Sequence, residues 1–188
     1  GKTPLETART PQMDFLAREG ILGLVDTIPP GFKAGSDVAN LSVLGYDPAT
    51  CYSGRGPLEA ANMGVALGPR DVAFRCNLVT LSESGEYANR VMVDYSAGEI
   101  NTGAAAALIG ELGSRLSTKD IRFYPGISYR HLMVWRGGPL GTRLTPPHDI
   151  TGRLIRDHLP AGTGGDIILD LMKESCRLLS GHPYNRSA

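Results

Sequence analysis

The sequence has few cysteines and no long apolar run. Its three cysteines, Cys51, Cys76 and Cys176, are odd in number and far apart. This spacing argues against a disulfide framework or a thiolate metal site, and it favours a reducing cytoplasm. No apolar stretch approaches the roughly 20 residues of a membrane span, and no charged-then-apolar leader opens the chain. We therefore expect a cytoplasmic protein with no membrane partner.

The chain also lacks net charge, because 19 basic residues balance 19 acidic ones. A neutral chain gives no reason to expect nucleic acid as a partner. The basic residues are mostly arginine, 15 of the 19. The planar fork of arginine suits carboxylate and phosphate better than lysine does. The excess is consistent with recognition of small anions and equally with a compositional bias of the genome.

What the chain does have is enough apolar sequence for a packed core, with 41% hydrophobic residues among 188. The 24 glycines and 13 prolines predict many turns without a collagen-like period. The first residues, GKTPLE, include no Met, and the last, HPYNRSA, directly follow a helical pattern. We therefore expect the chain to be a piece of a longer protein.

Residues 1–68 are predicted to be only part of a domain. Thr10 and Pro11 predict the start of a short helix over 10–19, and apolar residues at 38, 41 and 44 predict a helix from Ser36 to before Gly45. The stretch ILGLVDTIPPG, 21–31, predicts one brief strand closed by prolines. A single strand is too little to form a sheet.

Residues 69–181 alternate between strand and helix patterns. In 71–81, DVAFRCNLVTL, even positions such as Phe74 and odd positions such as Arg75 point to opposite faces, which predicts a strand. A strand over 89–95 can pair with it as a hairpin. A helix over 102–116, strands on either side of Pro125-Gly126 and a helix over 166–179 give the order β-β-α-β-β-α. We predict a small two-layer α/β domain, with 182–188 as a return linker.

Ser36 stands between a Gly/Pro-rich loop and the predicted helix. Serine is a favoured N-cap, because its hydroxyl accepts a hydrogen bond from backbone N–H groups left unpaired at the helix start. The same position suits a phosphate or a developing oxyanion. A nucleophilic serine also needs a metal or a base, and no base motif adjoins Ser36. The local sequence leaves both interpretations open.

Other candidates for anion binding lie on turns and strands. Arg55 stands between two glycines, which allow close approach to a ligand or simply mark a turn. Arg75 and Asn77 share one face of the predicted strand, as an anion clamp or as the solvated side of a sheet. Arg130 and His131 are adjacent, so a regular strand directs them to opposite faces.

His148 and Asp149 lie in the long Gly/Pro-rich loop 136–152, a kind of segment that often carries function. They are equally consistent with a local cap. His158 and His182 are isolated, and we interpret them as structural. The four histidines lack zinc-site spacing, and no nucleophile elbow, P-loop or dinucleotide motif occurs.

Seven stretches stand in an order that is more specific than any one of them: KTPLETARTPQMDFLAREG, PPGFKAGSDVANLSVLGYDP, YSGRGPLEAANMGVAL, DVAFRCNLVTL, ISYRHLMVW, TPPHDITG and SGHPYNR. Together they resemble the cofactor-independent phosphoglycerate mutases of the archaeal type, which belong to the alkaline phosphatase superfamily. The resemblance covers nearly the whole chain. It implies that 1–68 is part of a phosphatase-like catalytic domain and that 69–181 is an inserted α/β domain that closes over the substrate.

The resemblance also implies a reaction. Ser36 would be a metal ligand and would take the phosphoryl group of phosphoglycerate beside two divalent metal ions, Mn, Mg, Zn or Co. It would return the group to the other hydroxyl, a step of glycolysis and gluconeogenesis that uses no 2,3-bisphosphoglycerate. The substrate contacts would come from Arg55, Arg75, Asn77, Arg130, His131, His148 and Asp149.

The remaining metal ligands of the family, Asp and His residues, are expected before Gly1 and after Ala188. We therefore expect the 188 residues alone to bind no metal pair and to be inactive. Two other interpretations stay open. One is a phosphatase or phosphotransferase of the same superfamily that acts on another small phosphate. The other is a non-catalytic α/β module that binds an anion or a partner protein. The sequence does not predict an oligomeric state.

Overall fold

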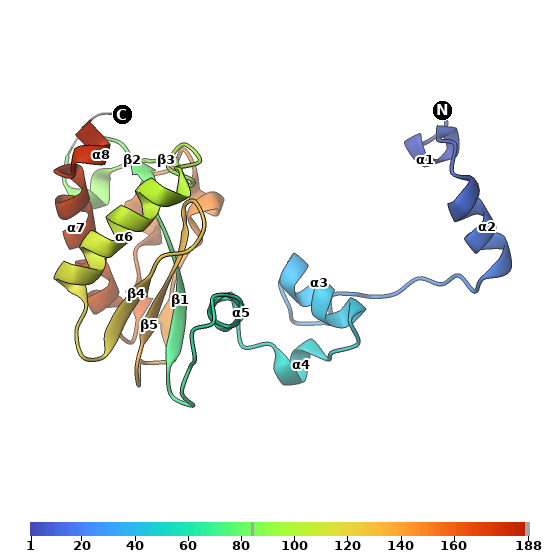
Figure 1. The fold of residues 1–188 in the computed structure, drawn as a ribbon, viewed down its shortest axis with the longest axis horizontal. Helices are drawn as coiled ribbons and strands as arrows, with labels where there is room; N and C mark the ends of the chain where they lie inside the picture. Colours follow the sequence, from blue (N-terminus) through green and yellow to red (C-terminus); the bar gives the residue numbers. More distant parts are fainter. Residues whose placement is uncertain (84, 187–188) are drawn as a thin grey trace. The chain divides into compact units, whose positions relative to one another are not determined.

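The computed structural model describes residues 1–83 and 85–186, and the chain divides into two compact units, Gly1–Tyr52 and Ser53–Ala188. The structure is mixed α/β, as expected, with helices and small antiparallel sheets (Figure 1). Among the described residues, no helix is both long enough and apolar enough to cross a membrane.

The first unit contains four short helices: α1 (Pro4–Thr7), α2 (Pro11–Glu19), α3 (Ser36–Val43) and α4 (Pro48–Cys51). The predicted helix over 10–19 is confirmed, with Pro11 at its first position. Thr10 is its N-cap residue by position, but its hydroxyl donates to the Asp14 Oδ1 atom at 3.1 Å rather than accepting from the backbone. The helix predicted from Ser36 is confirmed as α3.

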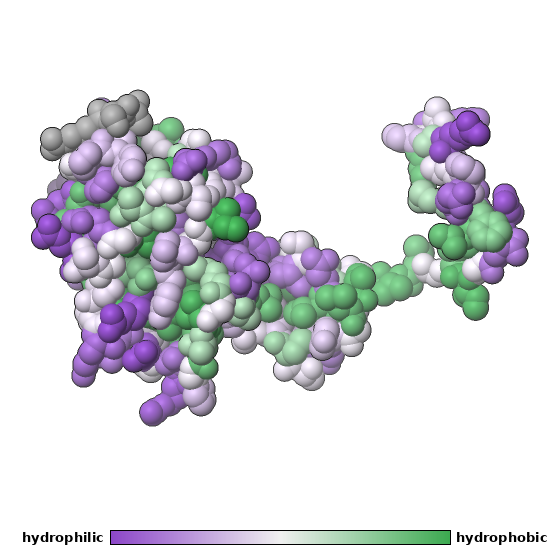
Figure 2. Space-filling model, in the orientation of Figure 1, coloured by the Kyte–Doolittle hydropathy of each residue, from purple (hydrophilic) through white to green (hydrophobic). Residues whose placement is uncertain are grey.

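The predicted strand over 21–31 is wrong. The segment forms no strand, and the apolar side chains of its first half are solvent-exposed, with Ile21 and Leu24 entirely so. In Figure 2 the stretch that joins α2 to α3 is coloured largely as hydrophobic. A strand needs a neighbour for its N–H and C=O groups, and no strand lies in the described part of this unit. The apolar pattern therefore has no partner to pair with.

The second unit is built on a three-stranded antiparallel sheet in the order β1-β5-β4. The strands are β1 (Val72–Asn77), β4 (Ile121–Tyr124) and β5 (Arg130–Trp135). The β4–β5 hairpin turns at Pro125-Gly126, as predicted. Strand β1 pairs with β5, and Asn77 lies opposite Arg130.

The predicted hairpin between 71–81 and 89–95 is confirmed only next to its turn. There β2 (Thr80–Leu81) pairs with β3 (Met92–Asp94) in a separate two-stranded sheet. Strand β1 is instead paired with β5, which comes later in the chain. The two hairpin strands are therefore shorter than the sequence pattern suggests.

Helices cover both faces of the main sheet. On one face, Ala60 of α5 (Arg55–Asn62) packs against Leu132 and Val134. On the other, α7 (Gly165–Ser180) contacts Met133 and Phe74, while α6 (Thr102–Leu116) packs beside α7 and against Phe123. This alternation follows the strand pattern predicted from the sequence.

The long loop after β5 contains small ordered elements rather than a bare connection. These are β6 (Thr142–Arg143), η2 (Pro147–Ile150), η3 (Ile155–His158) and β7 (Ala161–Gly162), with β6 and β7 paired. Ile150 and Ile155 pack with Met92 in a small core of their own. A further short helix, η1 (Tyr87–Asn89), precedes β3.

Helix α5 packs with the second unit, so the compact units divide at Tyr52 rather than at 68. The predicted boundary between a catalytic segment 1–68 and an inserted domain 69–181 concerns the longer protein and stays a prediction. The predicted return linker 182–188 contains α8 (Pro183–Arg186), and its last two residues lie outside the described residues.

We predict that Gly56→Ala lowers the free energy of unfolding of the second unit by about 2 kcal/mol, because overpacking a close contact has this order of cost. A Cβ atom at Gly56 would lie 1.9 Å from the Ala73 carbonyl oxygen, so α5 would have to move off β1. Urea unfolding measures the change. Gly110→Ala is the matched control on α6, where a Cβ meets nothing within 4 Å. It should stabilise by about 0.5–1 kcal/mol through helix propensity. Equal effects at both sites would contradict the packing of α5.

Candidate active site and anion-binding surface

Ser36 is the first residue of α3, and its side chain is exposed. The N-cap is Gly35, so the interpretation of Ser36 as the cap is wrong by one residue. The N–H groups of the first turn have no partners within the helix, and they favour negative charge nearby. Ser36 therefore presents its hydroxyl at a position suited to a phosphate group.

The sequence analysis did not single out the residues that fix the surroundings of Ser36. The Tyr52 hydroxyl donates a hydrogen bond to the Asp37 carboxylate. The Tyr52 ring meets Phe32 edge-on, with ring centroids 6.1 Å apart. These contacts tie the loop before α3 to the end of α4. Only the tertiary structure reveals them, because Asp37 and Tyr52 are separated by a turn and a second helix.

Arg55 begins α5 and is exposed. Its predecessor Gly54 has φ +116°, a conformation that other residues rarely adopt, so this glycine is required by the turn. Arg55 belongs to the second unit and Ser36 to the first. Their joint participation in one site stays a prediction.

Arg75 and Asn77 lie on the same sheet face as Arg130, as the pairing register requires. Arg75 is paired with Glu59 of α5, with Nε and Oε1 3.5 Å apart. Its charge is thus partly neutralised within the domain. Glu59 was not predicted as a partner, because its distance from β1 depends on the packing of α5.

Arg130 has a different environment. Its guanidinium carbon lies 5.0 Å from the centroid of the Tyr129 ring, a cation–π geometry. Its side chain is exposed, and within the part of the chain that the structure describes no carboxylate forms an ion pair with it. Arg130 is therefore a positive charge available to a ligand.

The aromatic contacts bring distant candidates together. The Tyr129 ring meets Tyr95 edge-on at 5.8 Å between centroids, and Tyr95 meets the His148 ring at 6.2 Å. His148 in turn lies beside Asp149, with Nε2 and Oδ1 3.4 Å apart. Tyr95 and Tyr129 were missed by the sequence analysis. We call Tyr95, Tyr129, Arg130 and His148 the aromatic cluster.

His131 lies on the opposite face of β5 from Arg130, as the strand pattern predicted, and it is 3% exposed. Its Nδ1 accepts a hydrogen bond from the Gly126 N–H at 3.0 Å, which assigns the proton of the neutral ring to Nε2. Nε2 is buried without a partner among the described residues. Burial lowers the pKa of His131 to about 4. This geometry favours a neutral structural histidine rather than a substrate contact.

We predict that the chain loses stability in acid because of His131. Its pKa is 6.5 when unperturbed and about 4 when buried. Between these values the unfolded chain binds more protons than the folded chain, so the free energy of unfolding falls as the pH falls. The loss of unfolding free energy approaches about 3 kcal/mol as the pH nears 4, since each unit of pKa difference is worth about 1.4 kcal/mol. Urea unfolding across this pH window measures it. His131→Gln, which can still accept from Gly126, should flatten the dependence, and an unchanged slope would contradict the assignment.

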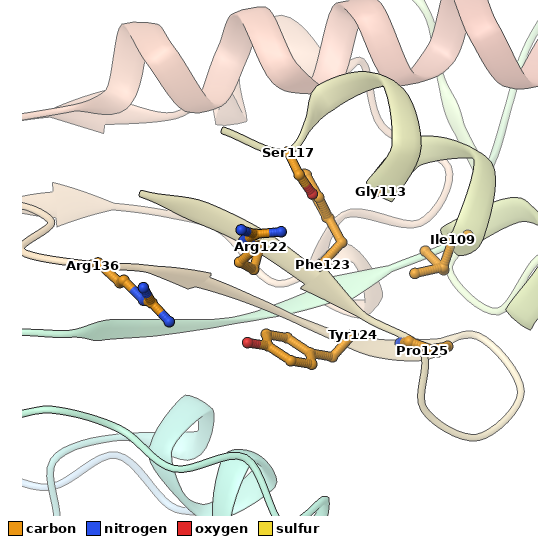
Figure 3. Close-up of a pocket in the computed structure, with 9 residues that line it drawn as sticks. Ile109, Gly113, Ser117, Arg122, Phe123, Tyr124, Pro125 and Arg136 are labelled. Carbon is orange, nitrogen blue, oxygen red and sulfur yellow. The ribbon is translucent and has the colours of Figure 1, made fainter. Parts of the chain in front are cut away.

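A hollow of about 480 Å³ lies between α6 and the edge strand β4 (Figure 3). Gly113 and Ser117 line it from the helix side, and Arg122, Tyr124 and Arg136 from the sheet side. None of the residues predicted for the site lines this hollow. It is therefore separate from the aromatic cluster.

The described residues do not supply a metal site. No group of three or more His, Cys, Asp or Glu side chains gathers in the described chain in a way that could hold a metal ion. A pair of divalent ions needs several carboxylate or imidazole ligands. The donor set found here does not fit the two metal ions that the resemblance implies.

Comparison with protein-family models matches residues 17–185 to the 2,3-bisphosphoglycerate-independent phosphoglycerate mutases. The chain belongs to this family. A probable 2,3-bisphosphoglycerate-independent phosphoglycerate mutase of Geobacter sulfurreducens is 54% identical over 186 residues, which are 99% of this chain and 46% of that protein. The enzyme of the same name from Methanosarcina barkeri is 55% identical over 98% of this chain and 45% of its own length.

Solved structures agree with the family assignment. The cofactor-independent phosphoglycerate mutase from Thermoplasma acidophilum matches 99% of this chain and 49% of its own, with 29% identity and a TM-score of 0.59. A Pyrococcus horikoshii protein matches all of this chain and 41% of its own, with 30% identity and a TM-score of 0.65. The chain spans about half the length of the curated relatives it matches.

Proposed function

We propose that the full-length protein interconverts 3-phosphoglycerate and 2-phosphoglycerate through a phosphoserine at Ser36. The family assignment supports this proposal, because the relatives are named phosphoglycerate mutases and do not depend on 2,3-bisphosphoglycerate. The structural observation that supports Ser36 as the nucleophile is its exposed hydroxyl at the start of α3.

In the proposed reaction, the Ser36 Oγ attacks the phosphorus atom of the bound phosphoglycerate. A bond forms from Oγ to phosphorus as the ester bond to the glycerate oxygen breaks. The proton of Ser36 leaves, and the released glycerate oxygen gains one. The reverse steps deliver the phosphoryl group to the neighbouring glycerate hydroxyl. The N–H groups in the first turn of α3 would stabilise the phosphoryl oxygens.

We further propose that the second unit is a substrate-capping domain whose basic side chains bind the substrate anions. Arg130 is the leading contact, because it is exposed and has no ion-pair partner among the described residues. Asn77 lies opposite it in the sheet, and His148 stands in the same aromatic cluster. Arg55, Arg75 and Asp149 complete the candidate set. Excluding water would keep the phosphoserine from being hydrolysed.

The two divalent metal ions expected for the family would lower the pKa of the Ser36 hydroxyl and neutralise the phosphoryl oxygens. Their ligands, apart from Ser36, would come from outside these 188 residues. We also propose a cytoplasmic location and membership of the alkaline phosphatase superfamily, based on the cysteine pattern and the motif order.

We predict that Ser36→Ala in the full-length protein lowers kcat by at least about 10³-fold and abolishes the phosphoenzyme, because no other hydroxyl replaces the nucleophile. Turnover of 3-phosphoglycerate and mass spectrometry of the Ser36 peptide measure the two effects. Ser42→Ala is the matched control on the same helix, where the Ser42 hydroxyl only donates to the Val38 carbonyl. It should leave kcat within about twofold. A Ser36→Ala enzyme that retains turnover would exclude the proposed nucleophile.

We also predict that the 188-residue chain alone neither binds two metal ions tightly nor turns over 3-phosphoglycerate. A calorimetric titration with Mn²⁺ measures metal binding, and a mutase assay on the same chain measures turnover. Tight binding of two ions with measurable turnover would overturn it. Release of inorganic phosphate by the full-length protein, in place of isomerisation, would favour a phosphatase.

A further inference from the structure

Tyr129 is the residue on which the exposed Arg130 rests, and its backbone is held in an unusual way. Ser128, directly before it, has φ +53°, a conformation that residues with a side chain rarely adopt. Two hydrogen bonds hold Ser128 there. Its N–H donates to the Thr102 Oγ1 at 3.1 Å, and its hydroxyl donates to the Ile100 carbonyl at 2.9 Å. Tyr129 therefore directly follows a turn whose geometry is fixed by hydrogen bonds to the segment 100–102.

The segment that holds Ser128 also carries Tyr95. Ala97 and Glu99 have φ +50° and +54°, so this second turn is strained as well. The Asp94 carboxylate accepts hydrogen bonds from the N–H groups of Ser96 and Gly98, which keep the pKa of Asp94 below its usual value. Strain of this kind persists only where the surrounding structure fixes it, and it gathers at ligand sites.

The two strained turns thus form one hydrogen-bonded frame. One end of the frame presents Tyr95 and the other presents Tyr129, and the two rings meet edge-on. Tyr129 cannot rotate away without losing this contact. The frame fixes the Tyr129 ring directly before the start of β5, and the Arg130 guanidinium lies over this ring.

We infer that Tyr129 is a positioning residue that holds the Arg130 guanidinium ready for an anionic group of the substrate. The inference rests on the proposed function for the identity of that anion, a phosphate or carboxylate of phosphoglycerate. An exposed arginine is otherwise free to adopt many rotamers, and binding must then restrict them. A ring beneath the guanidinium restricts it beforehand and leaves its N–H edge open to the ligand.

The test uses steady-state kinetics of the full-length protein with 3-phosphoglycerate. Tyr129→Leu should raise KM about threefold to tenfold, the range expected for losing a cation–π contact, and leave kcat within about twofold. Tyr129→Phe keeps the ring and should retain the wild-type KM. Tyr184→Leu is the control, because Tyr184 stacks on His182 outside the aromatic cluster. It should change neither constant.

A double-mutant cycle separates positioning from a general loss of structure. Arg130→Leu should raise KM, and adding Tyr129→Leu should raise it no further, because Tyr129 acts only through Arg130. Additive effects would overturn the inference while leaving Arg130 as a substrate contact. A Tyr129→Phe variant as impaired as Tyr129→Leu would overturn it as well, since the hydroxyl would then be the active group.

A second measurement is independent of catalysis. NMR relaxation of the Arg130 Nε–H group in the 188-residue chain measures how strongly the motion of the guanidinium is restricted. The group should be ordered in the wild type and in Tyr129→Phe, and mobile in Tyr129→Leu. Equal mobility in all three would refute the positioning role. If the full-length wild type fails to isomerise 3-phosphoglycerate, the proposed function fails, and this measurement still decides the inference.

Discussion

The second unit depends on the burial of β5 on both faces. Strand β5 is the middle strand of the sheet, and Leu132 is fully buried at its centre. Side chains that point one way meet α5, and those that point the other way meet α6 and α7. The N–H and C=O groups of β5 are paired with β1 on one side and β4 on the other. Strand β5 thus contributes side chains to a core on each face of the sheet. Its position also decides which face each of its side chains meets.

This constraint also separates Arg130 from His131. The two are neighbours in sequence, yet one lies exposed over Tyr129 and the other is buried and neutral. Because adjacent residues of a strand point to opposite faces, only one of the two side chains can lie on the exposed face. That side chain is Arg130, since His131 is buried and its Nδ1 accepts a hydrogen bond from the Gly126 N–H.

Among the described residues of the first unit, an apolar segment has no neighbouring strand with which to form a sheet. Ile21 and Leu24 have the composition of a strand, but no neighbouring strand lies in the described part of that unit, and they remain exposed. Exposed apolar runs of this kind normally mark a surface that another segment covers. The chain spans about half the length of its relatives, which is consistent with this pattern.

The sequence alone determined most of the longer helices and the family. Periodicity predicted α2, α3, α6, α7 and the alternation of β1, because these patterns reflect which face an element buries. The sequence motifs also named Ser36 and Arg130 as candidate site residues. Periodicity failed for the strand at 21–31 and for the partner of β1, since pairing depends on segments distant in the chain. Only the tertiary structure brought Tyr95, Tyr129 and His148 together and paired Arg75 with Glu59. These contacts arise from how the turns and helices pack on the sheet, and no local pattern encodes that packing.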